Sequence, residues 1–349
     1  MIRIAERNDV TEKKAVLIRM LAVVLALLTS GLFIMFLGHN PIDVYISMLE
    51  GSFGTLYRFR ETVVKTVPLV ITSLGILIAF KMKFWNIGAE GQIYMGAFLG
   101  SFFALNFPNM PKGLLIPIMI LAGIVGGGLY ALIPAFFKGK YNTNETLFTL
   151  MLNYIAIKWV TYLQYGPWKD PSANGFPKIA NFSDNATLPK LLGINIGWVI
   201  AIILVILVHI FIHNTKKGYE IEVIGESENT ARYAGINVSR TIMEAMFLSG
   251  GLCGLAGIIQ ASGVNHTLSV ELSGGMGYTA IIVTWLSQLS APLIALVSFL
   301  FALLIQGGSY IQTAFQIPQS AADIMQGIIL LFVLGCEFFI NYKFVRKKQ

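Results

Sequence analysis

Polar residues interrupt an otherwise apolar stretch of the chain at residues 81–100. The interruption consists of Asn86, Gly88, Glu90, Gly91 and Gln92. A carboxylate at the depth of a membrane is costly unless it is paired or faces a water-filled cavity. Glycines permit the backbone to leave a helix, and broken helices occur in membranes where they line a protein-enclosed cavity. The pattern indicates either a polar break along a transport pathway or a Glu90 carboxylate paired with Lys81 or Lys83 for stability.

A second glycine-rich interruption, SGGMGY, occupies residues 273–278 just before a short apolar run. Interrupted spans in corresponding positions of two halves point to inverted repeats around a central pathway. Other glycines recur in apolar segments at a spacing of four, which indicates close helix packing rather than ligand contact. These pairs are Gly96 with Gly100, Gly123 with Gly127 and Gly250 with Gly254.

The polar segment 219–240 predicts a short, well-capped helix. Ser227 can cap its first turn, and the Glu228 carboxylate favours the positive end of the helix. Gly235 is placed to stop the helix in a left-handed turn. Taken alone, this pattern is more typical of an ordinary well-capped loop than of a functional surface.

The composition indicates a membrane protein. Of 349 residues, 55% are hydrophobic and 12% are charged, about half of the roughly 25% charged residues of a soluble domain. A soluble protein with an exceptional core is the alternative. The apolar residues form runs long enough to cross a membrane as helices, which need about 20 residues. We therefore expect an all-α polytopic membrane protein.

About ten apolar spans are expected, forming a single transmembrane domain over residues 1–349 with two halves resembling inverted repeats. The segment 277–289 is short enough to be re-entrant. The expected spans are 16–38, 62–80, 87–107, 113–137, 144–165, 196–214, 241–262, 277–289, 291–313 and 319–340.

The basic residues predict the orientation of these spans. With the N-terminus (1–15) in the cytoplasm, most lysines and arginines fall on the cytoplasmic side, as the positive-inside rule requires. Both termini are then cytoplasmic, 166–193 is an external loop and 215–240 is a cytoplasmic loop. The net charge of +7 therefore orients the protein in a bacterial plasma (inner) membrane and does not indicate nucleic-acid binding.

Motifs for catalysis are missing from the sequence. Lys140 follows Gly139, but Pro134 stands where an ATP-binding P-loop needs its first glycine. Cys253 and Cys336 both lie in apolar stretches, which indicates neither a disulfide scaffold nor a metal site. We expect no enzyme activity, no metal and no cofactor in this chain.

Three motifs resemble one family. NIGAEGQ at 86–92, NETLFTLMLNYIA at 144–156 and GESENTARYAGINVS at 225–239 resemble the signatures of bacterial ABC importer permeases of the branched-chain amino acid and simple sugar class. The similarity runs from about residue 60 to the C-terminus, and it is closest to the permeases that import nucleosides. Simple sugars such as ribose or galactose are the alternative substrate. An ion-coupled secondary transporter and a membrane enzyme are the alternatives of other classes.

The resemblance implies two sets of functional residues. The segment 225–239 would be the coupling helix that docks on a cytoplasmic ABC ATPase, where ATP is bound. Its matching residues are Gly225, Glu226, Ala231, Arg232 and Gly235. The substrate pathway would include Asn86, Glu90, Gln92 and Asn153, whereas Lys158 on the same span as Asn153 is expected to be an anchor. The implied partners are the ATPase, a second homologous permease in a heterodimer, an extracytoplasmic substrate-binding lipoprotein and membrane lipid.

Overall fold

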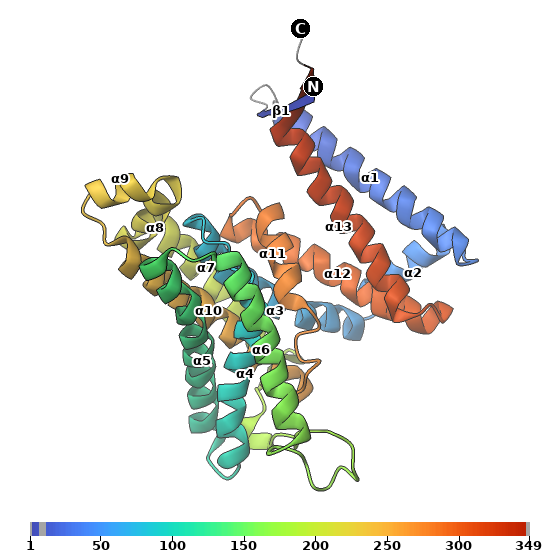
Figure 1. Ribbon diagram of the computed structural model, residues 1–349. Helices are drawn as coiled ribbons and strands as arrows, with labels where there is room; N and C mark the ends of the chain where they lie inside the picture. The colour runs from blue at the N-terminus through green and yellow to red at the C-terminus, as the bar shows by residue number, and fades with distance from the viewer. Residues whose placement is uncertain (1, 7–11, 347–349) are drawn as a thin grey trace. The chain divides into compact units, whose positions relative to one another are not determined.

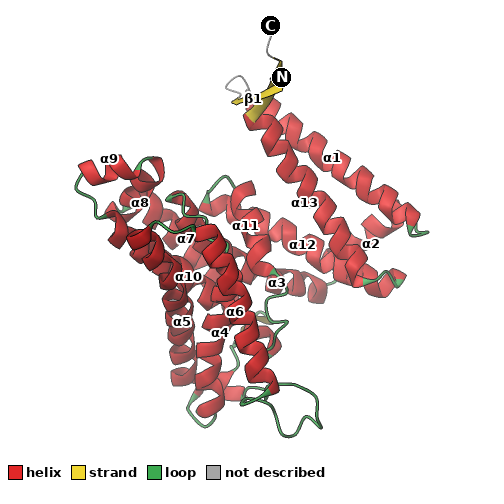
Figure 2. Ribbon diagram, viewed as in Figure 1, coloured by secondary structure: helices red, strands yellow, loops and turns green. Residues whose placement is uncertain are grey.

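The structure, a computed structural model, describes residues 2–6 and 12–346 and is mostly helical (Figures 1 and 2). Its elements in chain order are β1 (Ile2–Glu6), α1 (Glu12–Phe36), α2 (Pro41–Phe53), α3 (Leu56–Lys81), α4 (Ala89–Asn106), α5 (Lys112–Tyr141), α6 (Glu145–Tyr165), the 3-10 turn η1 (Asp184–Ala186), β2 (Lys190–Leu191), β3 (Ile194–Asn195), α7 (Gly197–Asn214), α8 (Lys216–Glu226), α9 (Glu228–Tyr233), α10 (Val238–Gln260), the π-helical turn η2 (Ala261–Asn265), α11 (Met276–Leu286), α12 (Ala291–Phe315), α13 (Gln319–Asn341) and β4 (Tyr342–Arg346).

Each of the ten apolar segments expected from the sequence is helical, with ends that differ by a few residues. Helix α2 was not expected, because its residues include Asp43 and Glu50 and form no long apolar run. The Asn40 side chain caps it by accepting a hydrogen bond from the Ile42 amide at 3.1 Å, and Pro41 opens its first turn. The expectation of an all-helical chain also omitted two short antiparallel strand pairs, β1 with β4 and β2 with β3.

Six of the described helices are long and apolar enough to cross a membrane, and seven if the bent pair of α1 and α2 forms one span. The six are α3, α5, α6, α7, α10 with η2, and α12. Helix α4 falls outside this set because its polar first turn lowers its mean hydropathy. Helix α11 rises only about 17 Å at 1.5 Å per residue, so it is too short to span the membrane alone, as the sequence indicated. The chain is therefore a polytopic helical membrane protein.

The first of two compact units contains Met1–Thr62 and Phe301–Gln349. Within it α1 lies against α13, and β1 pairs with β4 so that Ile2 is opposite Arg346. Figure 1 shows β1 at one end of this helix pair. Its core contains side chains from α1, α2, α12, α13 and the segment between α12 and α13, namely Ile34, Val44, Met48, Ile311, Ile317, Ala321, Ala322 and Met325.

The second unit, Val63–Leu300, is built on glycine contacts among α4, α5 and α10. A Cβ atom added to Gly96 would lie 2.1 Å from Gly254 Cα, and one added to Gly254 would lie 2.2 Å from the Gly123 carbonyl oxygen. No side chain fits at such distances, so these positions require glycine for the backbones to approach. The close-packing interpretation of the glycine pairs is confirmed.

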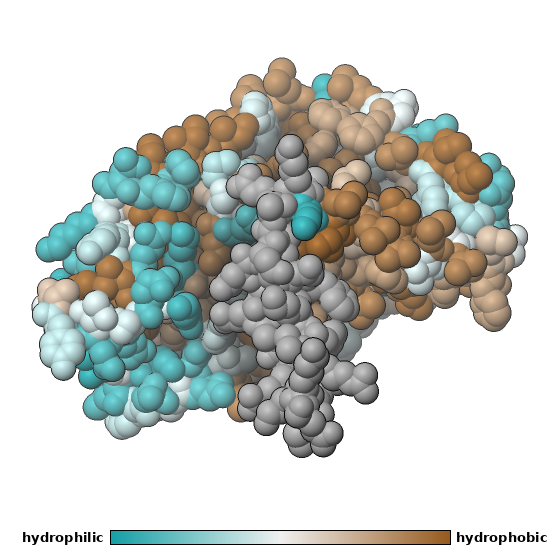
Figure 3. Space-filling view, turned by 90° about the horizontal axis from the view of Figure 1, so that it is seen from above, coloured by the Kyte–Doolittle hydropathy of each residue, from teal (hydrophilic) through white to brown (hydrophobic). Residues whose placement is uncertain are grey.

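The two long polar segments lie at opposite ends of this second unit (Figure 1). Residues 166–193 form an irregular loop that is fixed to the end of α10. There the Ser262 hydroxyl donates to the Ala186 carbonyl at 2.5 Å, and the Thr267 hydroxyl donates to the Ile179 carbonyl at 3.0 Å. Helices α8 and α9 form the other end, where hydrophilic residues gather on the surface seen at the left of Figure 3.

Candidate functional site

Glu90 lies at the meeting point of two helix N-termini. It occupies the first turn of α4 and is 3% exposed. Its carboxylate accepts hydrogen bonds from the Ser273 hydroxyl and, at 2.8 Å, from the Gly277 amide in the first turn of α11. Helix N-termini carry partial positive charge, so both helices stabilise the carboxylate.

The alternative in which Glu90 pairs with a lysine is wrong. Lys81 binds Glu222 instead, with 2.7 Å between the ammonium nitrogen and the carboxylate oxygen. Over residues 2–6 and 12–346, neither Lys81 nor Lys83 forms an ion pair with Glu90. The buried charge is held by hydrogen bonds and helix ends, and removing it leaves no basic side chain unmatched.

Asn86 and Gln92 form a reciprocal amide pair across the bend that precedes α4. The Asn86 Nδ2 donates to Gln92 Oε1 at 3.2 Å, and the Gln92 Nε2 donates to Asn86 Oδ1 at 3.1 Å. Asn86 Oδ1 also accepts from the Gly88 amide at 3.0 Å. The pair thus supplies a hydrogen-bond partner for the backbone where it has left the helix, because buried backbone groups outside a helix need such partners.

Asn153 joins the same bend from α6. Its Oδ1 accepts from the Gly91 amide at 2.8 Å, and its Nδ2 donates to the Ile87 carbonyl at 2.8 Å and to the Tyr278 hydroxyl at 3.3 Å. The four pathway residues expected from the sequence are therefore brought together in one buried cluster. Their polar groups bind one another and the nearby backbone, so in this conformation they hold the helix break in place.

The polar cluster includes partners from the glycine-rich interruption at 273–278. Ser273 and Gly277 bind Glu90, and Tyr278 binds Asn153. A Cβ atom added to Gly277 would lie 2.5 Å from the Glu90 amide nitrogen, so α11 reaches α4 only because this residue is glycine. The glycine-rich interruption at 273–278 was the signal for these residues, but it did not show which residues they contact.

Helix α9 forms as the capping pattern predicted. The Ser227 hydroxyl accepts from the Thr230 amide at 3.2 Å, and Gly235 follows the helix with a φ of +76°. A Cβ atom added to Gly225 would lie 2.1 Å from the Lys81 carbonyl oxygen, so this glycine lets the end of α8 pack on the end of α3.

The five residues expected on the coupling surface differ in exposure. Glu226, Arg232 and Gly235 are exposed, whereas Gly225 and Ala231 are buried within the unit. Tyr233, which sequence reasoning passed over, is 94% exposed at the end of α9. An aromatic side chain so exposed on a short helix is a candidate anchor for a partner protein.

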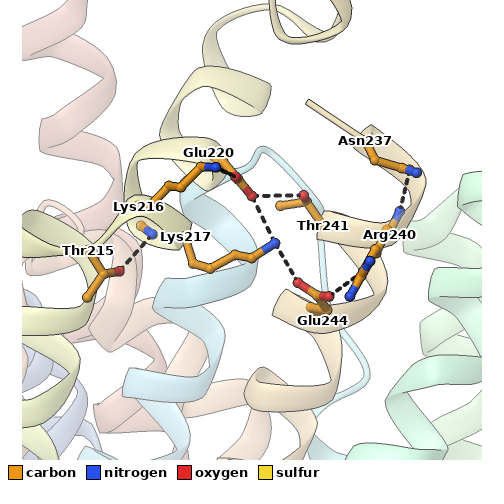
Figure 4. Close-up of polar contacts among 9 residues, drawn as sticks. Thr215, Lys216, Lys217, Glu220, Asn237, Arg240, Thr241 and Glu244 are labelled. Carbon is orange, nitrogen blue, oxygen red and sulfur yellow. Dashed lines mark hydrogen bonds and ion pairs between the residues drawn. The ribbon is translucent and has the colours of Figure 1, made fainter. Parts of the chain in front are cut away.

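Ion pairs tie α8 to the start of α10 (Figure 4). Lys217 lies 2.7 Å from Glu244 and 2.9 Å from Glu220, and Arg240 lies 2.8 Å from Glu244. Hydrogen bonds to Glu244 and Glu220 raise the pKa of Lys217 above its ordinary value, so its charge persists. Since α10 also packs on α4, this network links the end that carries α9 to the helix whose first turn contains Glu90.

Membrane-length helices around a buried polar break define a polytopic membrane protein. The chain belongs to the family described as the branched-chain amino acid transport system permease component, whose model matches residues 59–334.

Curated relatives are similar over nearly the full length. A glucose ABC transporter permease protein of Haloferax volcanii is 32% identical, covering 93% of this chain and 88% of the relative. A nucleoside ABC transporter permease protein of Lactococcus lactis is 29% identical over 98% and 96%. A guanosine ABC transporter permease protein of Bacillus subtilis is 26% identical over 91% and 92%. The chain is a permease subunit of an ABC transporter, as the three motifs implied, and it serves transport rather than catalysis.

Proposed function

We propose that this chain is the permease of an importer for nucleosides, driven by a separate cytoplasmic ABC ATPase that binds the ATP. The similarity to the nucleoside permease of Lactococcus lactis, over 98% of this chain and 96% of the relative, carries the proposal. The site supports a neutral substrate, because Glu90 already occupies the positive ends of α4 and α11 with the protein's own negative charge.

A simple sugar is the second candidate, favoured by the 32% identity to the glucose permease of Haloferax volcanii. Nucleosides and sugars both present hydroxyl groups to a polar path, so the two substrates demand similar hydrogen bonding. No observation on the described residues favours an ion-coupled transporter, which would need no docking helix.

The proposal includes a defined topology and two functional surfaces. The termini and the α8–α9 end face the cytoplasm of a bacterial cell, ten helices form two inverted repeats, and α4 and α11 are their half-helices. Asn86, Glu90, Gln92 and Asn153 shape the substrate pathway by holding the helix break. The coupling segment that docks on the ATPase contains Gly225, Glu226, Ala231, Arg232 and Gly235. Its exposed members Glu226, Arg232 and Gly235 form the docking surface with Tyr233 as the anchor, whereas Gly225 and Ala231 pack the segment against the rest of the unit.

The partners proposed are a second homologous permease, which completes a heterodimer, the ATPase and an extracytoplasmic binding lipoprotein.

Competition for uptake tests the substrate. Cells that express the four components and lack other uptake systems are given labelled uridine with an excess of unlabelled guanosine, ribose or glucose. We expect guanosine to compete and the sugars to have no effect. Competition by glucose or ribose alone would replace the nucleoside proposal with the sugar.

A further inference from the structure

A charged cavity of about 440 Å³ lies beside α9, between the end of α5 and the start of α10. Its charged lining residues are Lys138, Lys140, Glu228 and Arg232, so cations outnumber carboxylates. Lys138 is bound to a carboxylate of α6 at 3.0 Å, and Arg232 lies 3.8 Å from Glu228. Lys140 has no carboxylate partner among the residues that the structure describes, so its charge is available to an anion.

The surroundings of Lys140 are those of a membrane surface. Its ammonium group lies 5.5 Å from the ring centre of Phe136 and 5.3 Å from that of Tyr141. Both rings are exposed, at 45% and 59%. Aromatic residues gather at membrane–water interfaces, and basic residues beside them attract anionic lipid.

An apolar groove of about 410 Å³ begins at the loop that joins α5 to α6 and follows α6. Leu147, Met151 and Ile155 line it at a spacing of four residues, so they share one helix face, and each is more than half exposed. From Thr143 to Ile155 a helix rises about 18 Å, close to the ~15 Å of hydrocarbon in one leaflet. The groove therefore has the length of one acyl chain.

The charged cavity and the apolar groove meet at adjacent residues. Asn142 lines the cavity and Thr143 lines the groove. The cation of Lys140 and the apolar face of α6 are therefore close together in the chain.

We propose that this end of α5 and α6 binds one anionic phospholipid. Lys140 holds the headgroup phosphate, and one acyl chain lies along α6 over Met151. A soluble phosphate has no acyl chain to place in the groove, so the groove favours a lipid over a free phosphate. A second protein chain that covered the apolar groove would not require the charge of Lys140. The leaflet depends on the proposed orientation, whereas the binding does not depend on the solute carried.

Native mass spectrometry of the purified importer tests the proposal. The importer is released from nanodiscs that contain equal amounts of phosphatidylglycerol and phosphatidylcholine, and the retained lipids are counted. We expect wild type to retain phosphatidylglycerol selectively. Lys140→Gln should weaken its retention about fivefold, the typical contribution of one lysine near an anionic surface. Met151→Trp, which fills the groove at an exposed position, should prevent retention. Lys158→Gln, which removes an exposed cation of α6 outside both cavities, should match wild type.

Three results would overturn the proposal. Equal retention of phosphatidylglycerol by wild type and Lys140→Gln, with unchanged melting, would remove Lys140 from any lipid site. Displacement of the lipid by sn-glycerol 3-phosphate would show that a free phosphate is the ligand. Loss of the second permease subunit from Met151→Trp, with lipid retention intact, would show that the groove is a subunit interface.

Discussion

At the scale of residues, the sequence predicted which polar side chains around Glu90 are candidates for a function, but it did not predict their contacts. Asn86, Glu90 and Gln92 could be selected because polar side chains in a membrane-spanning segment are costly unless they have a function or a partner. Asn153 was selected from the family resemblance alone. Their arrangement could not be predicted, because the contacts of Asn153 with Gly91 and of Glu90 with α11 join segments far apart in the chain. The hydrogen bonds of Glu90 to Ser273 and Gly277, together with the ion pair of Lys81 with Glu222, exclude the pairing of Glu90 with a lysine, and only the fold places these partners.

Replacing Glu90 with Gln should slow transport without preventing assembly. The amide keeps the shape, and no cation is left unpaired, so the loss is confined to the charge at two helix N-termini, about 1 kcal/mol each. Uptake rate and the yield of monodisperse protein are measured together. Ser273→Ala, which removes one donor but keeps the charge, serves as the comparison and should reduce uptake less. Wild-type uptake by a normally assembled Glu90→Gln variant would show that the carboxylate has no part in transport.

At the scale of elements, apolar length was a sufficient guide to the long helices, since a span needs about 20 apolar residues. It was no guide to α2 and α8, which are short and carry charged residues. The capping pattern did predict α9, because Ser227 and Gly235 act through local backbone geometry. The sequence did not predict which face of α9 is buried, because the burial of Ala231 depends on neighbours from distant segments.

Replacing Tyr233 with Ala should weaken docking of the ATPase. An exposed aromatic anchor at a protein interface contributes about 2 kcal/mol, which corresponds to roughly thirtyfold in affinity. The affinity of the purified ATPase for the permease is measured by biolayer interferometry. Tyr219→Ala on α8, where the ring is 65% exposed, is the matched control and should bind as wild type does. Equal affinities of wild type and Tyr233→Ala would exclude Tyr233 from the docking surface.

At the scale of the whole molecule, composition identified a polytopic membrane protein, and the motifs identified its family. The number of membrane spans was harder to predict from the sequence, because α4 begins in a polar turn, α11 is short and α1 bends into α2 by 110°. Orientation was predicted from the basic residues alone and needs an experiment of its own.

Cysteine labelling tests the topology in intact cells. A cysteine at Ser227, at the start of α9, should be protected from an impermeant thiol reagent, whereas one at Ser172 in the 166–193 loop should react. The native Cys253 and Cys336 are buried, so the background should be low. Reaction at Ser227 together with protection at Ser172 would reverse the proposed orientation.

A measurement of what drives uptake, ATP or an ion gradient, tests most directly the central claim that this chain is an ABC importer permease. Proteoliposomes are prepared with this chain, its partner permease and the ATPase, and they receive the loaded binding protein and labelled uridine on the outside. Uridine accumulation should require ATP on the ATPase side and should be unaffected by collapsing sodium and proton gradients. Accumulation driven by an ion gradient without ATP hydrolysis would contradict the assignment of this chain as an ABC importer permease.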